Sequence, residues 1–172
     1  MSARSGTVRH VTVALNAPET GSGRPLVLLH AFPLSSEMWA DQRAELATAC
    51  RLVTPDQRGF GGTPLGDDEP SLDHVADDVA ALLDARAIDR AVVGGLSMGG
   101  YVALAYAKKY PQDLRGLILV DTKAEADTAE GKQGRQKMIE LARTQGAKAV
   151  AEQMMPKMLA KDSAARPQLA GA

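Results

Sequence analysis

The chain has 172 residues, of which 45% are hydrophobic and 24% charged, and its formal net charge is −1. This length fits one domain with a core of its own. The near-neutral charge argues against a protein that binds nucleic acid or an anionic membrane surface. The single cysteine, Cys50, allows no internal disulfide. No apolar run of about 18 residues and no signal-peptide pattern is present, so we expect a soluble, cytoplasmic protein.

The first 120 residues alternate between strand-like and helix-like segments. Apolar residues alternate loosely with polar ones over residues 7–15, which predicts an edge strand. This strand could run antiparallel to the others. Four short apolar runs predict strands buried on both faces, as in a parallel sheet: residues 25–29, 51–54, 91–94 and 116–120. Segments with helical periodicity separate them: residues 36–49, 71–87 and 98–110. This alternation predicts an α/β fold with right-handed crossovers.

The character of the chain changes after Asp121. Residues 122–134 are polar and lack strand signals. Residues 135–145 and 147–160 predict two helices separated by Gly146. Pro156 should kink or divide the second of them. The remaining residues, 161–172, are small and polar and should fray.

Ser97 lies in the sequence Gly95-Leu96-Ser97-Met98-Gly99, between a predicted strand and a predicted helix. Strand, G-x-S-x-G and helix in this order are typical of a nucleophile elbow. Small neighbours are needed because the serine backbone is strained there and a nearby β-carbon would collide with the turn. The helix N-terminus would face a developing oxyanion. The pattern predicts acyl transfer with Ser97 as nucleophile, and a tightly packed turn without catalysis is the alternative.

A second loop, residues 30–34, directly follows a predicted strand. It occupies the place expected for an oxyanion loop, so the backbone N–H groups of Phe32 and Met98 are the candidate donors. A buried His30 that holds the loop through backbone hydrogen bonds is more typical than a proton-transferring one. His30, Leu34 and Leu96 are the expected substrate contacts.

Two further strand ends carry acids. Residues 56–63 should form scaffolding near the site, with Arg58 paired to Asp56 or to a neighbouring loop. Asp121 could orient a histidine as a triad acid, or could only cap a loop. All three histidines, at positions 10, 30 and 74, precede Ser97. No metal-ligand spacing, P-loop or dinucleotide fingerprint is present, so we expect neither a metal nor a cofactor.

Together, the segments HAFPL, DQRGFGGT, GLSMGGYVAL and LILVDT resemble the α/β-hydrolase fold family over residues 8–125. The resemblance is greatest to its small serine esterases and enol-lactone hydrolases. It implies Ser97 as nucleophile, Phe32 and Met98 as oxyanion donors, and a helical cap after Val120. It also implies an incomplete hydrolase core over residues 1–122, with a mostly parallel sheet that stops after the sixth strand. Residues 123–172 would be the start of the cap and a tail.

The chain departs from the family pattern after the cap, where members continue with two strands that carry the acid and then the histidine. We therefore expect the N-terminal portion of an enzyme that acts on a small carboxylic ester or lactone, weakly active or inactive alone. A strand edge near residues 116–120 would be exposed, which favours self-association or a complementing C-terminal segment. The alternatives are a non-catalytic interaction module, perhydrolysis, or carbon–carbon bond hydrolysis on the same scaffold.

Overall fold

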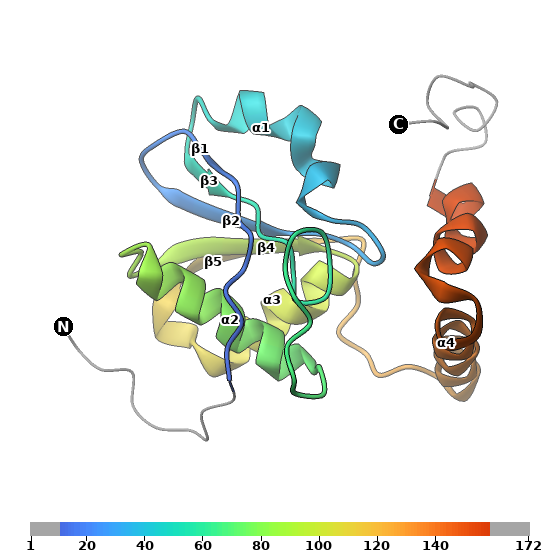
Figure 1. The fold of residues 1–172 in the computed structure, drawn as a ribbon. Coiled ribbons are helices and arrows are strands. Elements are labelled where there is room, and N and C mark those ends of the chain that lie inside the picture. The colour runs from blue at the N-terminus through green and yellow to red at the C-terminus, as the bar shows by residue number, and fades with distance from the viewer. Residues whose placement is uncertain (1–10, 159–172) are drawn as a thin grey trace. The chain divides into compact units, whose positions relative to one another are not determined.

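The computed structural model describes residues 11–158, which fall into two units with a boundary between Ala124 and Glu125 (Figure 1). The strands of the first unit are β1 (Glu19–Thr20), β2 (Pro25–Leu29), β3 (Arg51–Val53), β4 (Ala91–Leu96) and β5 (Leu114–Val120). Its helical elements are the 3-10 helix η1 (Ser36–Trp39), α1 (Ala40–Leu46), α2 (Leu72–Ala85), α3 (Met98–Lys109) and the 3-10 helix η2 (Pro111–Asp113). The second unit contains α4 (Ala129–Met158).

The strands form one sheet in the order β1-β3-β2-β4-β5, and only β1 runs antiparallel to its neighbour. The predicted α/β fold with a mostly parallel sheet is confirmed. Leu29 at the end of β2 lies opposite Gly95 of β4, which lies opposite Leu119 of β5. The segments that follow these three strands therefore leave the sheet at one edge, which is where open α/β sheets place their binding sites.

The edge strand predicted at residues 7–15 is wrong for its described part, because residues 11–15 form no strand and residues 7–10 lie outside the described range. The backbone N–H of Val13 donates to Oδ1 of Asp78 at 2.9 Å, so it bonds a helix side chain rather than a neighbouring strand. The antiparallel edge strand is β1, a few residues later. Residues 11–158 thus contain five strands up to Val120, the number that the sequence patterns predict, whereas the family resemblance implied six.

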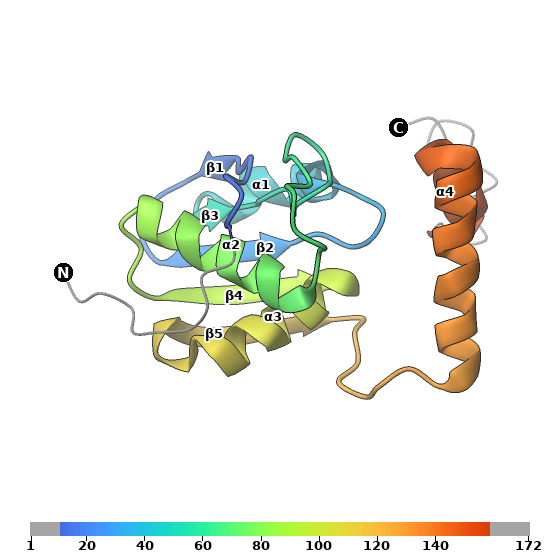
Figure 2. The same cartoon turned by 60° about the horizontal axis from the view of Figure 1, so that its bottom comes forward.

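Helices cover both faces of the sheet (Figures 1 and 2). The helices α2 and α3 pack on one face, where Val27, Val53 and Val93 join the main hydrophobic core. The opposite face carries a smaller cluster of Leu28, Trp39 and Leu52, against which Met38 of η1 and Leu46 of α1 are partly buried. Successive residues of β2 therefore point to opposite layers, which explains why the parallel strands are apolar throughout.

The sequence correctly predicts α2. Ser71 is its N-cap and accepts a hydrogen bond from the His74 N–H at 3.2 Å. Its buried apolar residues recur at helical spacing and face the core: Val75, Ala76, Val79, Leu82 and Leu83. The helix ends at Ala85, two residues before the predicted end.

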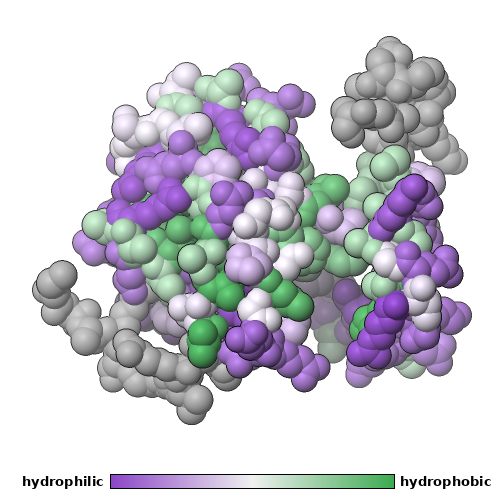
Figure 3. Space-filling model, in the orientation of Figure 1, coloured by the Kyte–Doolittle hydropathy of each residue, from purple (hydrophilic) through white to green (hydrophobic). Residues whose placement is uncertain are grey.

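The second unit is more helical than predicted, because α4 begins at Ala129, within the segment expected to be irregular. Gly146 has φ 82° and ψ 175°, so it separates two helical stretches as predicted. Pro156 lies inside the second stretch. The predicted tail at residues 161–172 lies outside the described residues. Figure 3 shows mainly hydrophilic residues on the α4 surface that faces the viewer. No helix in the described range 11–158 combines the length and the hydrophobicity needed to cross a membrane.

Candidate active site

Ser97 lies in a strained turn between β4 and α3. Its φ is 52° and its ψ −110°, a conformation that non-glycine residues rarely adopt. The Ser97 N–H donates to the Val120 carbonyl at 3.0 Å, and its carbonyl accepts from the Gly100 N–H at 3.0 Å and the Thr122 hydroxyl at 2.9 Å. The main chain of Ser97 is thus held on both sides, while its partly exposed side chain makes no helix-capping hydrogen bond.

The glycines around Ser97 are required by close backbone contacts. A β-carbon on Gly95 would lie 2.1 Å from the carbonyl carbon of Gly99, and one on Gly99 would lie 2.2 Å from the Leu29 carbonyl oxygen. A β-carbon on Gly100 would lie 2.6 Å from the Thr122 side chain. The first turn of α3 therefore presses directly on the ends of β4 and β2. This packing is what the G-x-S-x-G spacing predicts for an elbow.

The candidate oxyanion donors lie in the segments that follow two adjacent strands, β2 and β4. Met98 is the first residue of α3, so its N–H has no acceptor within the helix and lies at the positive end of the helix dipole. Phe32 follows β2, the parallel neighbour of β4, and is partly buried. The contact of Gly99 with the Leu29 carbonyl brings the two segments together at the sheet edge.

The two predicted leucine contacts lie in different surroundings. The side chain of Leu34 is 37% exposed, and its backbone N–H closes a turn on the Ala31 carbonyl at 2.9 Å. Leu96, the last residue of β4, is partly buried against the cluster that contains Leu28 and Trp39. The side chain of Leu34 is therefore accessible to a ligand, whereas that of Leu96 mainly packs against the protein.

His30 is fully buried, at 0% exposure. Its Nε2 accepts the Gln57 N–H at 3.0 Å, and its Nδ1 lies 3.0 Å from the Ala31 carbonyl, so the proton belongs on Nδ1. Burial lowers the pKa of His30 from its ordinary value, against the Ala31 carbonyl and the Asp56 charge, which raise it. The neutral ring thus holds the loop through backbone groups. The His30 side chain is fully buried in this structure, and the expected substrate contact stays a prediction.

Asp56, three residues after the end of β3, connects three segments. Its carboxylate accepts the Ser36 N–H at 2.6 Å, the Asn16 side-chain amide at 2.7 Å and the Gly62 N–H at 2.8 Å. Burial raises the pKa of Asp56, but the hydrogen bonds from Gly62, Ser36 and Asn16 outweigh it and leave the pKa below its ordinary value. Sequence reasoning placed this segment near the site but missed its partners, because Ser36 and Asn16 are 20 and 40 residues away and Gly62 donates through its backbone.

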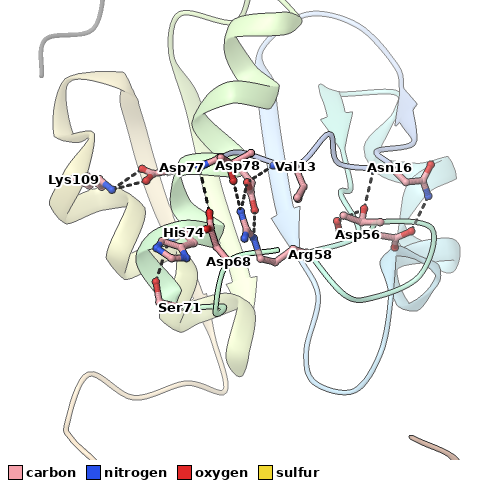
Figure 4. A network of polar contacts seen from close by, with 12 residues as sticks. Val13, Asn16, Asp56, Arg58, Asp68, Ser71, His74, Asp77, Asp78 and Lys109 are labelled. Atoms are coloured by element: carbon pink, nitrogen blue, oxygen red, sulfur yellow. Dashed lines mark hydrogen bonds and ion pairs between the residues drawn. The ribbon is translucent and has the colours of Figure 1, made fainter. Parts of the chain in front are cut away.

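The sequence left two partners open for Arg58, Asp56 or a neighbouring loop, and the structure shows that Arg58 does not pair with Asp56. Its Nε donates to Asp78 of α2 at 2.7 Å, and Nη2 donates to the same carboxylate at 2.8 Å (Figure 4). The side chains are 1% and 0% exposed, and this pair raises the pKa of Arg58 despite burial. Asp78 also accepts the Val13 N–H, so one buried carboxylate ties the N-terminal segment and the loop after β3 to α2.

Asp121 follows β5 at the same sheet edge as Ser97. It is exposed and has φ 41°, and the residues on its two sides, Val120 and Thr122, both hydrogen-bond the Ser97 main chain. Within residues 11–158, no three His, Cys, Asp or Glu side chains come together as a metal site would require.

Comparison with known proteins agrees with this geometry. Residues 24–154 match the family model of the alpha/beta hydrolase fold. A thermophilic esterase from Thermogutta terrifontis has a TM-score of 0.85 and 39% identity over 91% of this chain and 58% of its own. The enol-lactonase from Burkholderia xenovorans LB400 has a TM-score of 0.82 and 27% identity over 91% of this chain and 61% of its own.

A curated relative, the 2-hydroxymuconate semialdehyde hydrolase of Pseudomonas sp. (strain CF600), is 34% identical over 63% of this chain and 40% of its own length. The chain thus spans less than half the length of this relative and about three fifths of the two solved structures. The matched family model, the sheet order and the tight turn at Ser97 agree, and the chain belongs to the alpha/beta hydrolase fold family.

Proposed function

We propose that Ser97 is the nucleophile of a hydrolase that acts on carboxylic esters or lactones. The observation that carries this proposal is the strained φ of 52° at Ser97, in a turn where Gly95 and Gly99 leave no room for a β-carbon. Strain of this kind costs about 1–3 kcal/mol and concentrates at functional sites. The likeness to an esterase and an enol-lactonase supports the same class of substrate.

In the proposed reaction, Ser97 Oγ attacks the substrate carbonyl carbon, and the N–H groups of Phe32 and Met98 stabilise the oxyanion. A histidine takes the serine proton and returns it to the leaving alcohol, which produces an acyl-enzyme that water then hydrolyses. His30 is unsuited to this role because both its ring nitrogens face backbone groups. His10 and His74 also precede Ser97, whereas the family order places the base after the nucleophile. We therefore propose that the base comes from polypeptide outside this sequence, with Asp121 as the candidate acid that orients it.

The edge of the sheet at β5 is the proposed place for that polypeptide. The strand β5 is the last in the sheet order, and its residues Leu117, Ile118, Leu119 and Val120 are 36–46% exposed. Apolar strand edges of this kind pair readily with another strand. A complementing C-terminal segment would cover this edge and place a histidine near Ser97. Association of the chain with itself is the competing outcome.

A fluorophosphonate probe tests the nucleophile. We expect weak labelling of the chain alone, and strong labelling of a chimera that joins it to the C-terminal portion of the Thermogutta terrifontis esterase. The Ser97→Ala variant of the chimera should not be labelled, whereas the matched Ser71→Ala variant, which loses only the N-cap of α2, should be labelled normally. Equal labelling of Ser97→Ala, or an unlabelled folded chimera, would contradict the proposal.

Carbon–carbon bond hydrolysis is the second candidate, because the chain is 34% identical to a 2-hydroxymuconate semialdehyde hydrolase. The same elbow could serve both reactions, so substrate profiling separates them. Faster turnover of a 2-hydroxy-6-oxo-dienoate than of p-nitrophenyl acetate would favour this candidate. Peroxide-dependent formation of peracid would instead indicate perhydrolysis. A folded complex that turns over neither substrate class would favour a non-catalytic interaction module.

A further inference from the structure

The loop that follows β3 contacts the loop that follows β2 at three separate points. The first loop is residues 56–62, which we call the brace, and the second is residues 30–36, which contains Phe32. Both loops are anchored at the same edge of the sheet because β2 and β3 are parallel neighbours. The contacts between them bear on how well the Phe32 N–H is positioned.

The first contact is a two-point grip of Gln57 on His30. The Gln57 N–H donates to Nε2 of the His30 ring at 3.0 Å, and the Gln57 side-chain amide donates to the His30 carbonyl at 2.7 Å. Gln57 is 1% exposed and His30 0%. The hydrogen bonds fix both the ring and the main chain of the residue two positions before Phe32.

The second contact holds the far end of the same loop. The Asp56 carboxylate accepts the Ser36 N–H at 2.6 Å, and its other oxygen accepts the Gly62 N–H at 2.8 Å. A β-carbon on Gly61 would lie 2.3 Å from this carboxylate, so the brace wraps closely around it. Asp56 therefore ties the end of the Phe32 loop to both ends of the brace.

The third contact is aromatic. The ring of Phe60, at the tip of the brace, lies edge-on to the His30 ring at 5.3 Å and to the Phe32 ring at 5.9 Å between centroids. Edge-to-face pairs of this geometry are favourable and directional. The Phe32 side chain is thus held by the same loop that grips its neighbours on the main chain.

We propose that Asp56 and Gln57 are positioning residues that set the Phe32 N–H for oxyanion stabilisation. The inference rests on the proposed function at Ser97. An oxyanion donor must lie about 2.7–3.1 Å from the developing charge, and a misplacement of about 1 Å can cost roughly 100-fold in rate. Loss of the Asp56 contacts or of the Gln57 contacts should therefore lower kcat, while ground-state binding of the substrate should change little.

The test compares Asp56→Asn and Gln57→Met with Asp113→Asn. Asp113 is also a buried carboxylate, 8% exposed, but it precedes β5 at the opposite edge of the sheet. Turnover of p-nitrophenyl acetate is measured in the form of the protein that shows Ser97-dependent activity. Hydrogen exchange of residues 30–36 and of the elbow at residues 95–100 is measured on the chain itself. We expect kcat to fall about 10- to 100-fold in the two brace variants, with KM within about twofold.

Hydrogen exchange should accelerate in residues 30–36 of the brace variants but not in the elbow, and Asp113→Asn should show neither change. An unchanged kcat in both brace variants, or an equal loss in Asp113→Asn, would overturn the inference. If the wild type has no Ser97-dependent turnover, the proposed function fails separately. Hydrogen exchange then still tests whether Asp56 and Gln57 position residues 30–36, and unaltered exchange there overturns that part of the inference as well.

Discussion

The two sides of the elbow differ in how completely the chain supplies their contacts. On the β2–β3 side, His30, Gln57 and Asp56 are at most 3% exposed. Gln57 donates two hydrogen bonds to His30, and Asp56 accepts one from the Ser36 N–H. On the β5 side, Leu119 is 46% exposed and its strand lies at the sheet edge. Buried contacts thus fix the β2–β3 side, which we call the built side, whereas the β5 side, which we call the open side, is exposed. Under the proposed function, the first would hold an oxyanion and the second would face the catalytic base.

The largest expected effect is on the built side. Asp78→Asn removes the partner of a buried arginine, and such losses cost about 3–5 kcal/mol. Urea unfolding should show a free energy of unfolding lower by that amount. Glu37→Gln removes the partner of Arg43 in an exposed pair and should cost less than about 1 kcal/mol. Similar losses in the two variants would show that the buried network contributes no more than a surface ion pair.

A smaller loss is expected where the two sides meet. Gly99→Ala would place a β-carbon 2.2 Å from the Leu29 carbonyl, so α3 must move away from β2. We expect a loss of about 3 kcal/mol in the free energy of unfolding, at the upper end of overpacking effects. Gly134→Ala is the matched control, because no atom outside the nearby backbone of its own helix lies within 4 Å of its β-carbon position. A Gly99→Ala variant as stable as wild type would contradict the close packing at the elbow.

A substitution on the open side should change the self-association of the chain rather than its free energy of unfolding. Leu119→Lys places a charge on the edge strand, so we expect reduced binding of a hydrophobic dye and less self-association in light scattering. The free energy of unfolding should change by less than about 0.5 kcal/mol. Leu72→Lys substitutes an equally exposed leucine, 44% against 46%, at the start of α2. An equal loss of dye binding in that control would argue against a specific edge.

The smallest effect is the pH dependence of the built side. The pKa of His30 in the folded chain lies below its ordinary value of 6.5. Just below pH 6.5, His30 is therefore protonated more in the unfolded chain than in the folded chain. Stability from this residue is complete above pH 6.5 and declines as the pH falls toward the folded pKa. Asp56 adds a second decline below pH 3.8, its ordinary value. His30→Gln should flatten only the first decline in thermal unfolding, and an unchanged profile would contradict a neutral, buried ring.

Local patterns predict the parts of this molecule that depend on local chemistry. Strands β2 to β5 and the three helices between them follow from apolar runs and helical periodicity. The elbow at Ser97 is predictable because the G-x-S-x-G spacing itself is local, and the contact that requires Gly95 is with Gly99, four residues away. The start of α4 was missed because residues 129–134 contain no apolar stripe, which is the only helix signal that periodicity provides.

Contacts between distant segments explain the remaining errors. Residues 11–15 have the alternation of a strand, yet the Val13 N–H is satisfied by Asp78, 65 residues away. The partner of Arg58 lies 20 residues away, and the three donors to Asp56 come from three different segments. Charge and residue type alone allow many pairings of this kind, and only the folded chain selects one.

The hydrogen bond from the Ser97 N–H to the Val120 carbonyl links the strained turn to the last strand. The Thr122 hydroxyl strengthens that link from the other side of Asp121. A strand that docked along β5 would restrict the motion of the Val120 carbonyl, which accepts the hydrogen bond from the Ser97 N–H. Under the proposed function, pairing at the β5 edge and ordering of the Ser97 main chain would then be coupled.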